Sequence, residues 1–268
     1  MFAADARTLS RIAPTIQRVV IVDQNLASAR LLLDIMKSLG AREVVHETEE
    51  VRALDSIREI EPGLIFTERA GAGLDGENLT RTLRRSNLAS RRAPVVMVTA
   101  EATATSIKGA RDCGVHEFLR KPFTSADLFR RIENVALKPR DWIEGVAYVG
   151  PDRRRFNSGE YAGPQKRKQD RPASGTAAAL AVKVQAMRIL TAAVAQFDND
   201  PMQAVRAARQ QAETLKGLAI KTSDAKLAIA AAGLEATLAA GHPTKAILAQ
   251  PIGLILALTS PEPLARAC

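Results

Sequence analysis

Short apolar runs alternate with helix-spaced segments over residues 18–137, and this alternation constrains the fold more than any other feature of the chain. Residues 18–23 are rich in β-branched side chains and too short for a helix, whereas residues 26–39 place leucines at helical spacing before Gly40. The pattern recurs, with further strands expected at residues 44–45, 64–66, 94–99 and 116–120 and further helices at residues 49–60, 77–85, 104–113 and 125–137. Such repeated strand–helix units predict an α/β fold with a five-stranded, doubly wound parallel sheet covered by helices on both faces.

The rest of the chain divides into three parts. Residues 1–16 are expected to be an N-terminal tail before the α/β domain at residues 17–137. Residues 138–174 break the periodicity and form an expected linker, rich in Arg and Lys, that holds the chain's only Trp and both its Tyr residues. Beyond it the chain is rich in alanine, and helices are expected at residues 176–198, 201–221, 224–240 and 243–258. Their short connections predict a C-terminal four-helix bundle over residues 175–262.

Composition excludes several classes of protein. Cys113 and Cys268 are the only two cysteines, too few for a disulfide framework, and no Cys/His cluster has zinc spacing. The N-terminus has no signal-peptide pattern, and we find no continuous apolar run long enough to span a membrane. The net charge of +9 is unevenly distributed, and the density of positive charge is highest in the linker, where it would attract phosphates or acidic surfaces. A cytoplasmic protein without membrane insertion is expected.

Polar residues follow four of the expected strands. They are Asp23, Glu68, Thr99 and Lys121. Ligands of parallel sheets bind at the carboxyl ends of the strands, so we expect these side chains to lie together. Together with the strings Ile-Val-Asp23, Asp75-Gly76, Val98-Thr-Ala-Glu101 and Lys121-Pro-Phe123, this pattern resembles a response-regulator receiver domain of the chemotaxis type, which has a flavodoxin-like fold.

The resemblance implies a role for each matched residue. In the family, an aspartate that ends the third strand takes a phosphoryl group from a phosphohistidine, and two acids that end the first strand hold Mg²⁺. Carried over, Asp23 is one metal-binding acid, Thr99 and Lys121 bind phosphoryl oxygens, and Phe118 is the aromatic residue that reports the state of the site.

Two positions depart from the family pattern. Gln24 stands where the second metal-binding acid is usual, and a neutral amide is a weaker ligand for Mg²⁺, so no metal or other cofactor is expected. Glu68 stands where the acceptor aspartate belongs, and its extra methylene moves the carboxylate by ~1 Å, enough to cost ~10²-fold in rate. We expect Glu68 to pair with Lys121 and to accept a hydrogen bond from Thr99. The domain is therefore predicted to be a pseudo-receiver with no catalytic residue.

The second helix of the expected bundle carries the string Glu213-Thr-Leu-Lys216-Gly217. It resembles the histidine-phosphotransfer signature, with Glu213 at the position of the histidine. The resemblance implies that Lys216 would stabilise phosphate and that Gly217 would let a receiver approach. A helical docking bundle unrelated to that family is the alternative.

The linker contains a Tyr-x-Gly-Pro-x motif followed by three basic residues, and the motif occurs twice. The candidate ligand-binding residues are Tyr148, Arg153, Arg154, Arg155, Tyr161 and Arg167. Arginine can pair with guanine or bind phosphate, and tyrosine can stack on a base. The string Gly150-Pro-Asp-Arg-Arg-Arg155 resembles the arginine-rich tail of chemotaxis-type receivers that bind cyclic di-GMP. A spacer without a ligand, or a patch that docks on an acidic protein, is the alternative.

The sequence thus favours a non-enzymatic two-component regulator that binds histidine kinases, receivers or motility components. Two other hypotheses stay open: a cyclic di-GMP effector that uses the linker, and a residual phosphorelay protein that uses Glu68. Neither the identity of the partner nor the oligomeric state follows from the sequence.

Overall fold

The computed structural model describes residues 5–153 and 175–258, and these form two compact units. The first unit contains the described residues up to Ile143 together with those from Tyr148 onward to residue 153. The second contains Glu144–Ala147 and the C-terminal helices.

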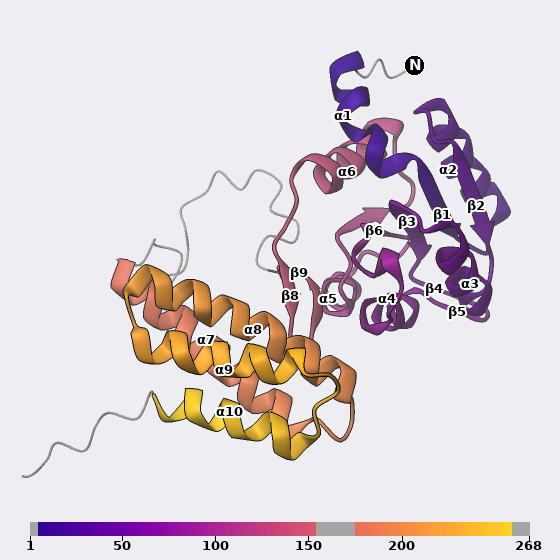
Figure 1. Ribbon diagram of the computed structural model, residues 1–268. Helices are drawn as coiled ribbons and strands as arrows, with labels where there is room; N and C mark the ends of the chain where they lie inside the picture. Colours follow the sequence, from indigo (N-terminus) through magenta and orange to yellow (C-terminus); the bar gives the residue numbers. More distant parts are fainter. Residues whose placement is uncertain (1–4, 154–174, 259–268) are drawn as a thin grey trace, which may run out of the picture. The chain divides into compact units, whose positions relative to one another are not determined.

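The core of the first unit is a five-stranded parallel sheet (Figure 1). Its strands are β1 (Arg18–Val22), β2 (Glu43–Glu47), β3 (Leu64–Glu68), β6 (Val95–Thr99) and β7 (Glu117–Arg120), in the order β2-β1-β3-β6-β7. The three central strands are buried on both faces, which explains their continuous runs of Val, Ile and Leu. The predicted doubly wound α/β fold is confirmed.

Helices cover both faces of this sheet. They are α2 (Leu26–Ser38), α3 (Glu50–Ile60), α4 (Gly76–Arg85), α5 (Ala104–Cys113) and α6 (Ser125–Leu137). Helices α2 and α6 pack on one face, while α3, α4 and α5 pack on the other. Between β3 and α4 the chain makes a small antiparallel hairpin, β4 (Ala70–Gly71) with β5 (Leu74–Asp75). Asp75 caps α4, and Gly76 fits there because a Cβ atom would collide with the backbone carbonyl oxygen of Glu68.

The expected N-terminal tail is largely a helix. Helix α1 (Ala6–Ile16) packs against α6, and Ile12 and Ile16 are fully buried in the core that α2 and α6 share. The apolar residues Leu9, Ile12 and Ile16 recur at helical spacing, which indicates a helix. The expectation that residues 1–16 are a tail overlooked this signal.

The expected linker also begins as folded structure. Strands β8 (Trp142–Glu144) and β9 (Val149–Pro151) pair with each other, and β9 packs against α4. Burial of Tyr148, together with Val146 and Val149, contributes to the driving force. The remainder of the expected linker, residues 154–174, lies outside the described residues.

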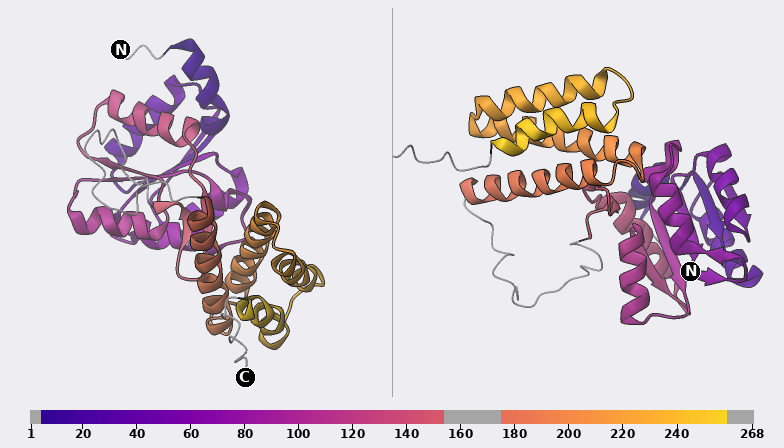
Figure 2. Two further views of the ribbon diagram at one scale, coloured as in Figure 1. Left: turned by 90° about the vertical axis from the view of Figure 1, so that its left-hand side faces the viewer. Right: turned by 90° about the horizontal axis from the view of Figure 1, so that it is seen from below.

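The second unit contains four helices, as predicted (Figure 2). They are α7 (Gly175–Ala195), α8 (Pro201–Thr222), α9 (Ala225–Ala239) and α10 (Lys245–Ala257). Leu190, Leu215 and Leu234 are fully buried in their shared core, and Val146 joins it from the segment 144–147. Asp200 caps α8 directly before Pro201. Within the described residues, α7 alone is long and apolar enough to cross a membrane by length and composition, a test that core helices of soluble bundles also pass.

Candidate functional site

The predicted polar residues gather at the carboxyl edge of the sheet. Asp23 directly follows β1, Glu68 ends β3, Thr99 ends β6, and Lys121 directly follows β7. Asp23 and Thr99 are buried, while Glu68 and Lys121 are partly exposed. Their common location follows from the parallel strand order, which brings the ends of separate strands to one edge.

Lys121 binds two carboxylates at this edge. Its Nζ donates hydrogen bonds to Glu68 Oε2 and, at 2.9 Å, to Asp23 Oδ2. The exposed fractions of the Lys121, Glu68 and Asp23 side chains are 19%, 16% and 3%, so the attraction is only weakly screened by water. The predicted pair of Glu68 and Lys121 is therefore confirmed.

The pKa values of this pair reflect two acids that share one cation. Burial lowers the pKa of Lys121, but hydrogen bonds to Glu68 and Asp23 outweigh burial, so the net pKa is raised and the ammonium stays charged. Burial raises the pKa of Glu68, Lys121 partly opposes this rise, and the nearby Asp23 carboxylate reinforces it. The site is a carboxylate–ammonium–carboxylate cluster, with two acidic groups and one basic group.

Thr99 does not make the expected hydrogen bond to Glu68. Its Oγ1 accepts a hydrogen bond from the backbone N–H of Glu101 at 3.2 Å, and the bonds described for the first unit include none between Thr99 and Glu68. This local bond forms at the turn after β6, where a threonine side chain competes for nearby backbone donors.

Gln24 faces the hairpin between β3 and α4. Its Nε2 donates a hydrogen bond to the carbonyl oxygen of Ala72, and its Oε1 lies against Gly71. The second oxygen of Asp23 accepts the backbone N–H of Asn25 at 2.9 Å. Both Asp23 oxygens and one Glu68 oxygen are thus bonded to nitrogen donors, so in this conformation the residues present do not fit Mg²⁺ as a ligand set.

Comparison with known proteins agrees with this geometry. Residues 19–133 match the family described as "Response regulator receiver domain". This part of the chain is a receiver domain. Two curated relatives, the DNA-binding response regulators MtrA of Mycolicibacterium paratuberculosis and Mycobacterium leprae, are each 27% identical over 116 residues. The match covers 43% of this chain and 49% of each relative, so the chain spans about half the length of these relatives.

Solved receiver structures resemble the same part of the chain. The chemotaxis protein CheY4 of Vibrio cholerae is 19% identical, with a TM-score of 0.42, over 44% of this chain and 97% of that one. The receiver domain of sensor histidine kinase PA1611 from Pseudomonas aeruginosa, described with a magnesium ion in its active-site cleft, is 26% identical with a TM-score of 0.41. That match covers 46% of this chain and 98% of the other.

Arg69 is a site residue of the receiver domain that sequence reasoning missed. Its guanidinium pairs with Glu101 at 2.7 Å and with Glu77 at 3.4 Å, so it links the residue after β3 to α4 and to the segment that precedes α5. The adjacency of Arg69 to Glu68 was the available signal, but its two partners are distant in sequence. Phe118 is buried on β7, and its role as the reporting aromatic stays a prediction.

The structure uses both described residues of the candidate ligand site within the receiver unit. Tyr148 is buried, and its hydroxyl donates to the carbonyl oxygen of Pro151 at 2.6 Å. Arg153 pairs with Asp112 at 3.1 Å, and its guanidinium lies 4.4 Å from the centre of the Tyr148 ring. Both side chains thus have partners within the fold, and their role in ligand binding stays a prediction. The other candidates, Arg154, Arg155, Tyr161 and Arg167, lie outside the described residues.

A second arginine–aromatic cluster was not foreseen. The guanidinium groups of Arg84, Arg91 and Arg92 each lie within 6 Å of the centre of the Trp142 ring. Arg84 is fully buried and donates to the carbonyl oxygens of three residues and to the ring of His116. Burial, with help from nearby Arg91, lowers the pKa of Arg84 to about 10. This cluster attaches the start of the expected linker to the receiver domain.

The bundle motif lies on α8, as predicted. Glu213 is exposed, and Lys216 pairs with Glu235 on α9 at 2.6 Å. A Cβ atom at Gly217 would point into open space, so internal packing does not require the glycine there. Whether this bundle is related to histidine phosphotransferases stays a prediction.

Proposed function

We propose that this chain is a non-catalytic two-component regulator whose receiver domain acts through protein–protein interaction without accepting a phosphoryl group. The observation that carries the proposal is the contact of the Lys121 ammonium with Glu68, the residue that ends β3. The Glu68 carboxylate binds the Lys121 ammonium group, which a transferred phosphoryl group would need for charge stabilisation.

The chemistry of acceptance explains why this contact matters. An acceptor carboxylate must have an oxygen free to attack, and a lysine must be free to stabilise the incoming charge. Here one ammonium is shared by Glu68 and Asp23. The extra methylene of Glu68 also displaces the attacking oxygen by ~1 Å, which is enough to cost ~10²-fold in rate.

The same contact supports a signalling role that does not depend on phosphorylation. A carboxylate hydrogen-bonded to Lys121 supplies negative charge at the end of β3 without chemistry. Surfaces that phosphorylation normally controls would then stay in one state. The proposed partners are histidine kinases, other receivers and motility components. A histidine-phosphotransfer-like bundle with Glu213 in place of histidine is consistent with this proposal, because neither domain would then carry a phosphoryl group.

A phosphodonor experiment tests the proposal. The full chain is incubated with acetyl phosphate and Mg²⁺, and intact mass is measured for wild type, Glu68→Asp and Glu68→Gln. We expect no stoichiometric gain of a phosphoryl group by wild type and a partial gain by Glu68→Asp, which restores the shorter side chain. A gain by wild type that Glu68→Gln abolishes would instead establish a residual phosphorelay protein and overturn the proposal.

We propose cyclic di-GMP binding by the arginine run as a second candidate function. The observation that favours it is the attachment of the segment before Arg154: Arg153 is held on Tyr148 and Asp112, so the rest of the run starts from a fixed point on the receiver domain. Such anchoring reduces the entropy that a ligand-binding segment loses on ordering.

A further inference from the structure

Helix α7 is strongly apolar yet poorly buried. Its stretch Ala178–Ala195 has a mean hydropathy of 1.5, but only 22% of these residues are buried. Leu180, Val182 and Val184 are 61%, 42% and 37% exposed. Leu180 and Val184 are four residues apart and share a side of the helix. Exposed apolar surface of this kind in a folded unit marks a site of interaction.

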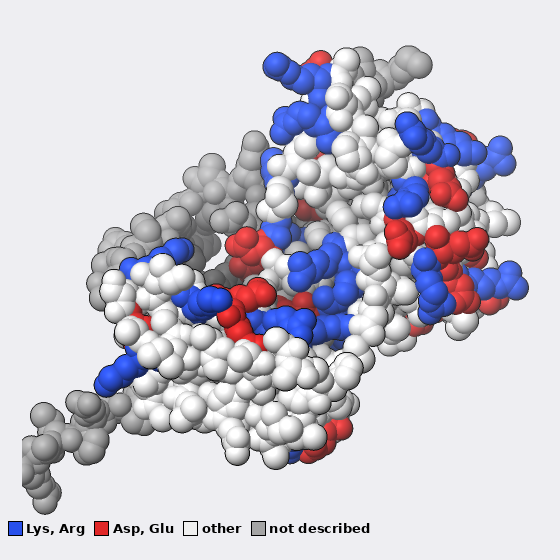
Figure 3. All heavy atoms as spheres, in the orientation of Figure 1, with Lys and Arg blue, Asp and Glu red and all other residues white. Residues whose placement is uncertain are grey.

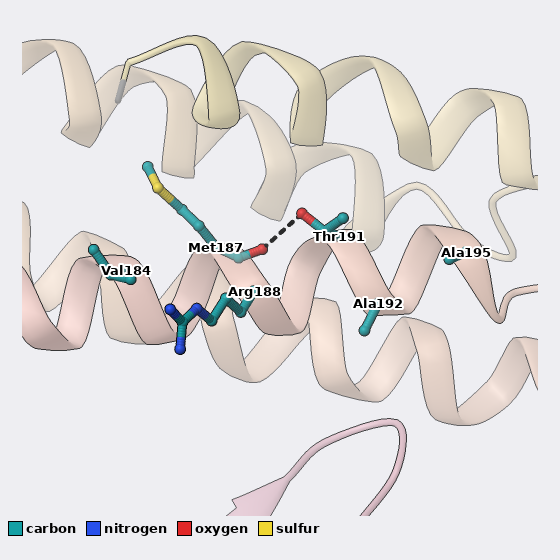
Figure 4. Close-up of a pocket in the computed structure, with 6 residues that line it drawn as sticks. All are labelled: Val184, Met187, Arg188, Thr191, Ala192 and Ala195. Atoms are coloured by element: carbon teal, nitrogen blue, oxygen red, sulfur yellow. Dashed lines mark hydrogen bonds between the residues drawn. The ribbon is translucent and has the colours of Figure 1, made fainter. Parts of the chain in front are cut away.

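A groove runs along the exposed side of α7 (Figure 4). It measures about 530 Å³ and is lined by Val184, Met187, Arg188, Thr191, Ala192 and Ala195. These positions recur every three or four residues, so they form one stripe along the helix. The small side chains at residues 191, 192 and 195 leave room for a second helix to approach the α7 backbone closely.

The helix that carries the groove has basic residues but no acidic ones. Neither α7 nor α10 contains Asp or Glu, and Figure 3 shows the bundle surface around α10 as largely uncharged. Lys183 pairs with Asp224, and Lys245 pairs with Asp198. Arg188 is exposed within the groove and, among the described residues, has no ion pair. The groove therefore combines an apolar stripe with one available cation.

These properties discriminate between possible occupants. In a second copy paired about the groove, the two Arg188 side chains would lie near each other, because Arg188 is close to the middle of the stripe, and like charges oppose such pairing. Helices that lie on membranes are rich in Lys and Arg and carry aromatic anchors, whereas α7 has one unpaired cation and no aromatic residue. A protein helix with an apolar side and an acidic residue satisfies both the stripe and Arg188.

We infer that the α7 groove is a docking site for an amphipathic, acidic helix of a partner protein. The apolar side of that helix lies against Val184 and its neighbours along the stripe, and an Asp or Glu on it pairs with Arg188. All groove residues lie on α7, and docking there does not depend on whether the receiver domain accepts a phosphoryl group.

The test uses two labelled peptides and the full chain. The first peptide is about as long as the Ala178–Ala195 stretch, with leucines at three- and four-residue spacing and flanking glutamates. The second replaces each glutamate with lysine. Fluorescence anisotropy measures binding to wild type, Val184→Asp, Arg188→Glu and Ile229→Asp. Ile229 on α9 is a matched control because it is apolar and 75% exposed but lies outside the groove.

We expect wild type and Ile229→Asp to bind the acidic peptide with micromolar affinity, and Val184→Asp to bind it at least about tenfold more weakly, because a charge replaces an apolar contact of the groove. Arg188→Glu should weaken the acidic peptide and strengthen the basic one. Each variant should fold, because both groove positions are exposed. Thermal unfolding checks this expectation. Equal weakening by Ile229→Asp, or indifference to peptide charge, would overturn the proposal.

Two further measurements address the rejected occupants. Sedimentation of the full chain shows whether it forms dimers that Val184→Asp dissociates, and flotation with vesicles of neutral and anionic phospholipid shows whether Val184 mediates membrane binding. Either positive result would assign the groove to that occupant and overturn docking of an acidic helix. Negative results in both, with the expected peptide preferences, support it.

Discussion

Lys121 donates a hydrogen bond to the carboxylate of Glu68 and thereby joins the segment after β7 to the last residue of β3, two strands that are separated by β6. The same ammonium reaches Asp23 after β1 at 2.9 Å. One cation therefore holds together three strand ends, and its removal would leave two neighbouring carboxylates to repel each other. The first prediction tests this arrangement.

Lys121→Met should lower the free energy of unfolding by about 1–3 kcal/mol, between the values for exposed pairs and for fully buried pairs. Adding Glu68→Gln should recover part of the loss, because it removes one of the two repelling acids. Urea unfolding at neutral pH measures both variants. Lys37→Met, at an exposed lysine on α2, is the control and should change stability little. Strictly additive losses from the two site substitutions would contradict the shared-cation arrangement.

Arg84→Ala should destabilise the receiver domain by about 3–5 kcal/mol, because it leaves several buried hydrogen-bond acceptors without their donor. The Arg84 guanidinium serves the carbonyl oxygens of Gly114, Arg91 and Ala93. Arg84→Lys should recover only a small part, since an ammonium cannot reproduce the planar fork of donors. Denaturant unfolding measures both, and full rescue by lysine would show that charge, not geometry, is what the position requires.

Acid should destabilise the receiver domain through His116. Burial, together with nearby Arg84 and Arg140, holds the pKa of His116 well below its usual 6.5. As pH falls below 6.5, the imidazole of His116 binds a proton in the unfolded chain but not in the folded chain. The free energy of unfolding therefore falls with pH until the folded pKa is reached. The unprotonated Nδ1 is the atom that faces Arg84 and the Val95 N–H.

His116→Asn keeps an acceptor in reach and removes the titration. We expect the loss of stability between pH 7 and pH 5 to be smaller in this variant than in wild type, as measured by urea unfolding across that range. Other acids, such as Glu117, whose pKa is raised by burial, titrate in both proteins and cancel in the comparison. Parallel pH profiles would contradict the assignment.

The linker hypothesis makes its own prediction. Calorimetry should detect micromolar binding of cyclic di-GMP, weaker binding of cyclic di-AMP at the same salt concentration, and no binding to an Arg153/Arg154/Arg155→Ala variant. Asp112→Asn is the matched control, because it breaks the Arg153 ion pair without removing a guanidinium. Equal binding of the two nucleotides would reduce the run to a basic patch, and binding of neither would exclude the ligand.

Much of the receiver domain could be predicted because its signals are local. Strand and helix periods fixed the sheet and its helices, and the polar residues after each strand had to meet at one edge of a parallel sheet. The contact between Glu68 and Lys121 followed from that rule. Thr99 departed from prediction: its Oγ1 accepts the backbone N–H of Glu101, and a local bond of this kind has no periodic signature.

The sequence by itself thus determined the five strands of the sheet, the helices that cover it, the residues that end the strands, and that a helical bundle follows, but it missed α1, β8 and β9. Only the tertiary structure decided which distant partners meet: Arg69 with Glu101, Arg84 with His116, and Arg153 with Tyr148. The reason is physical. A hydrophobic period records which side of an element is buried, whereas the choice of a partner for a guanidinium depends on which carbonyl, carboxylate or ring the packed elements bring within reach.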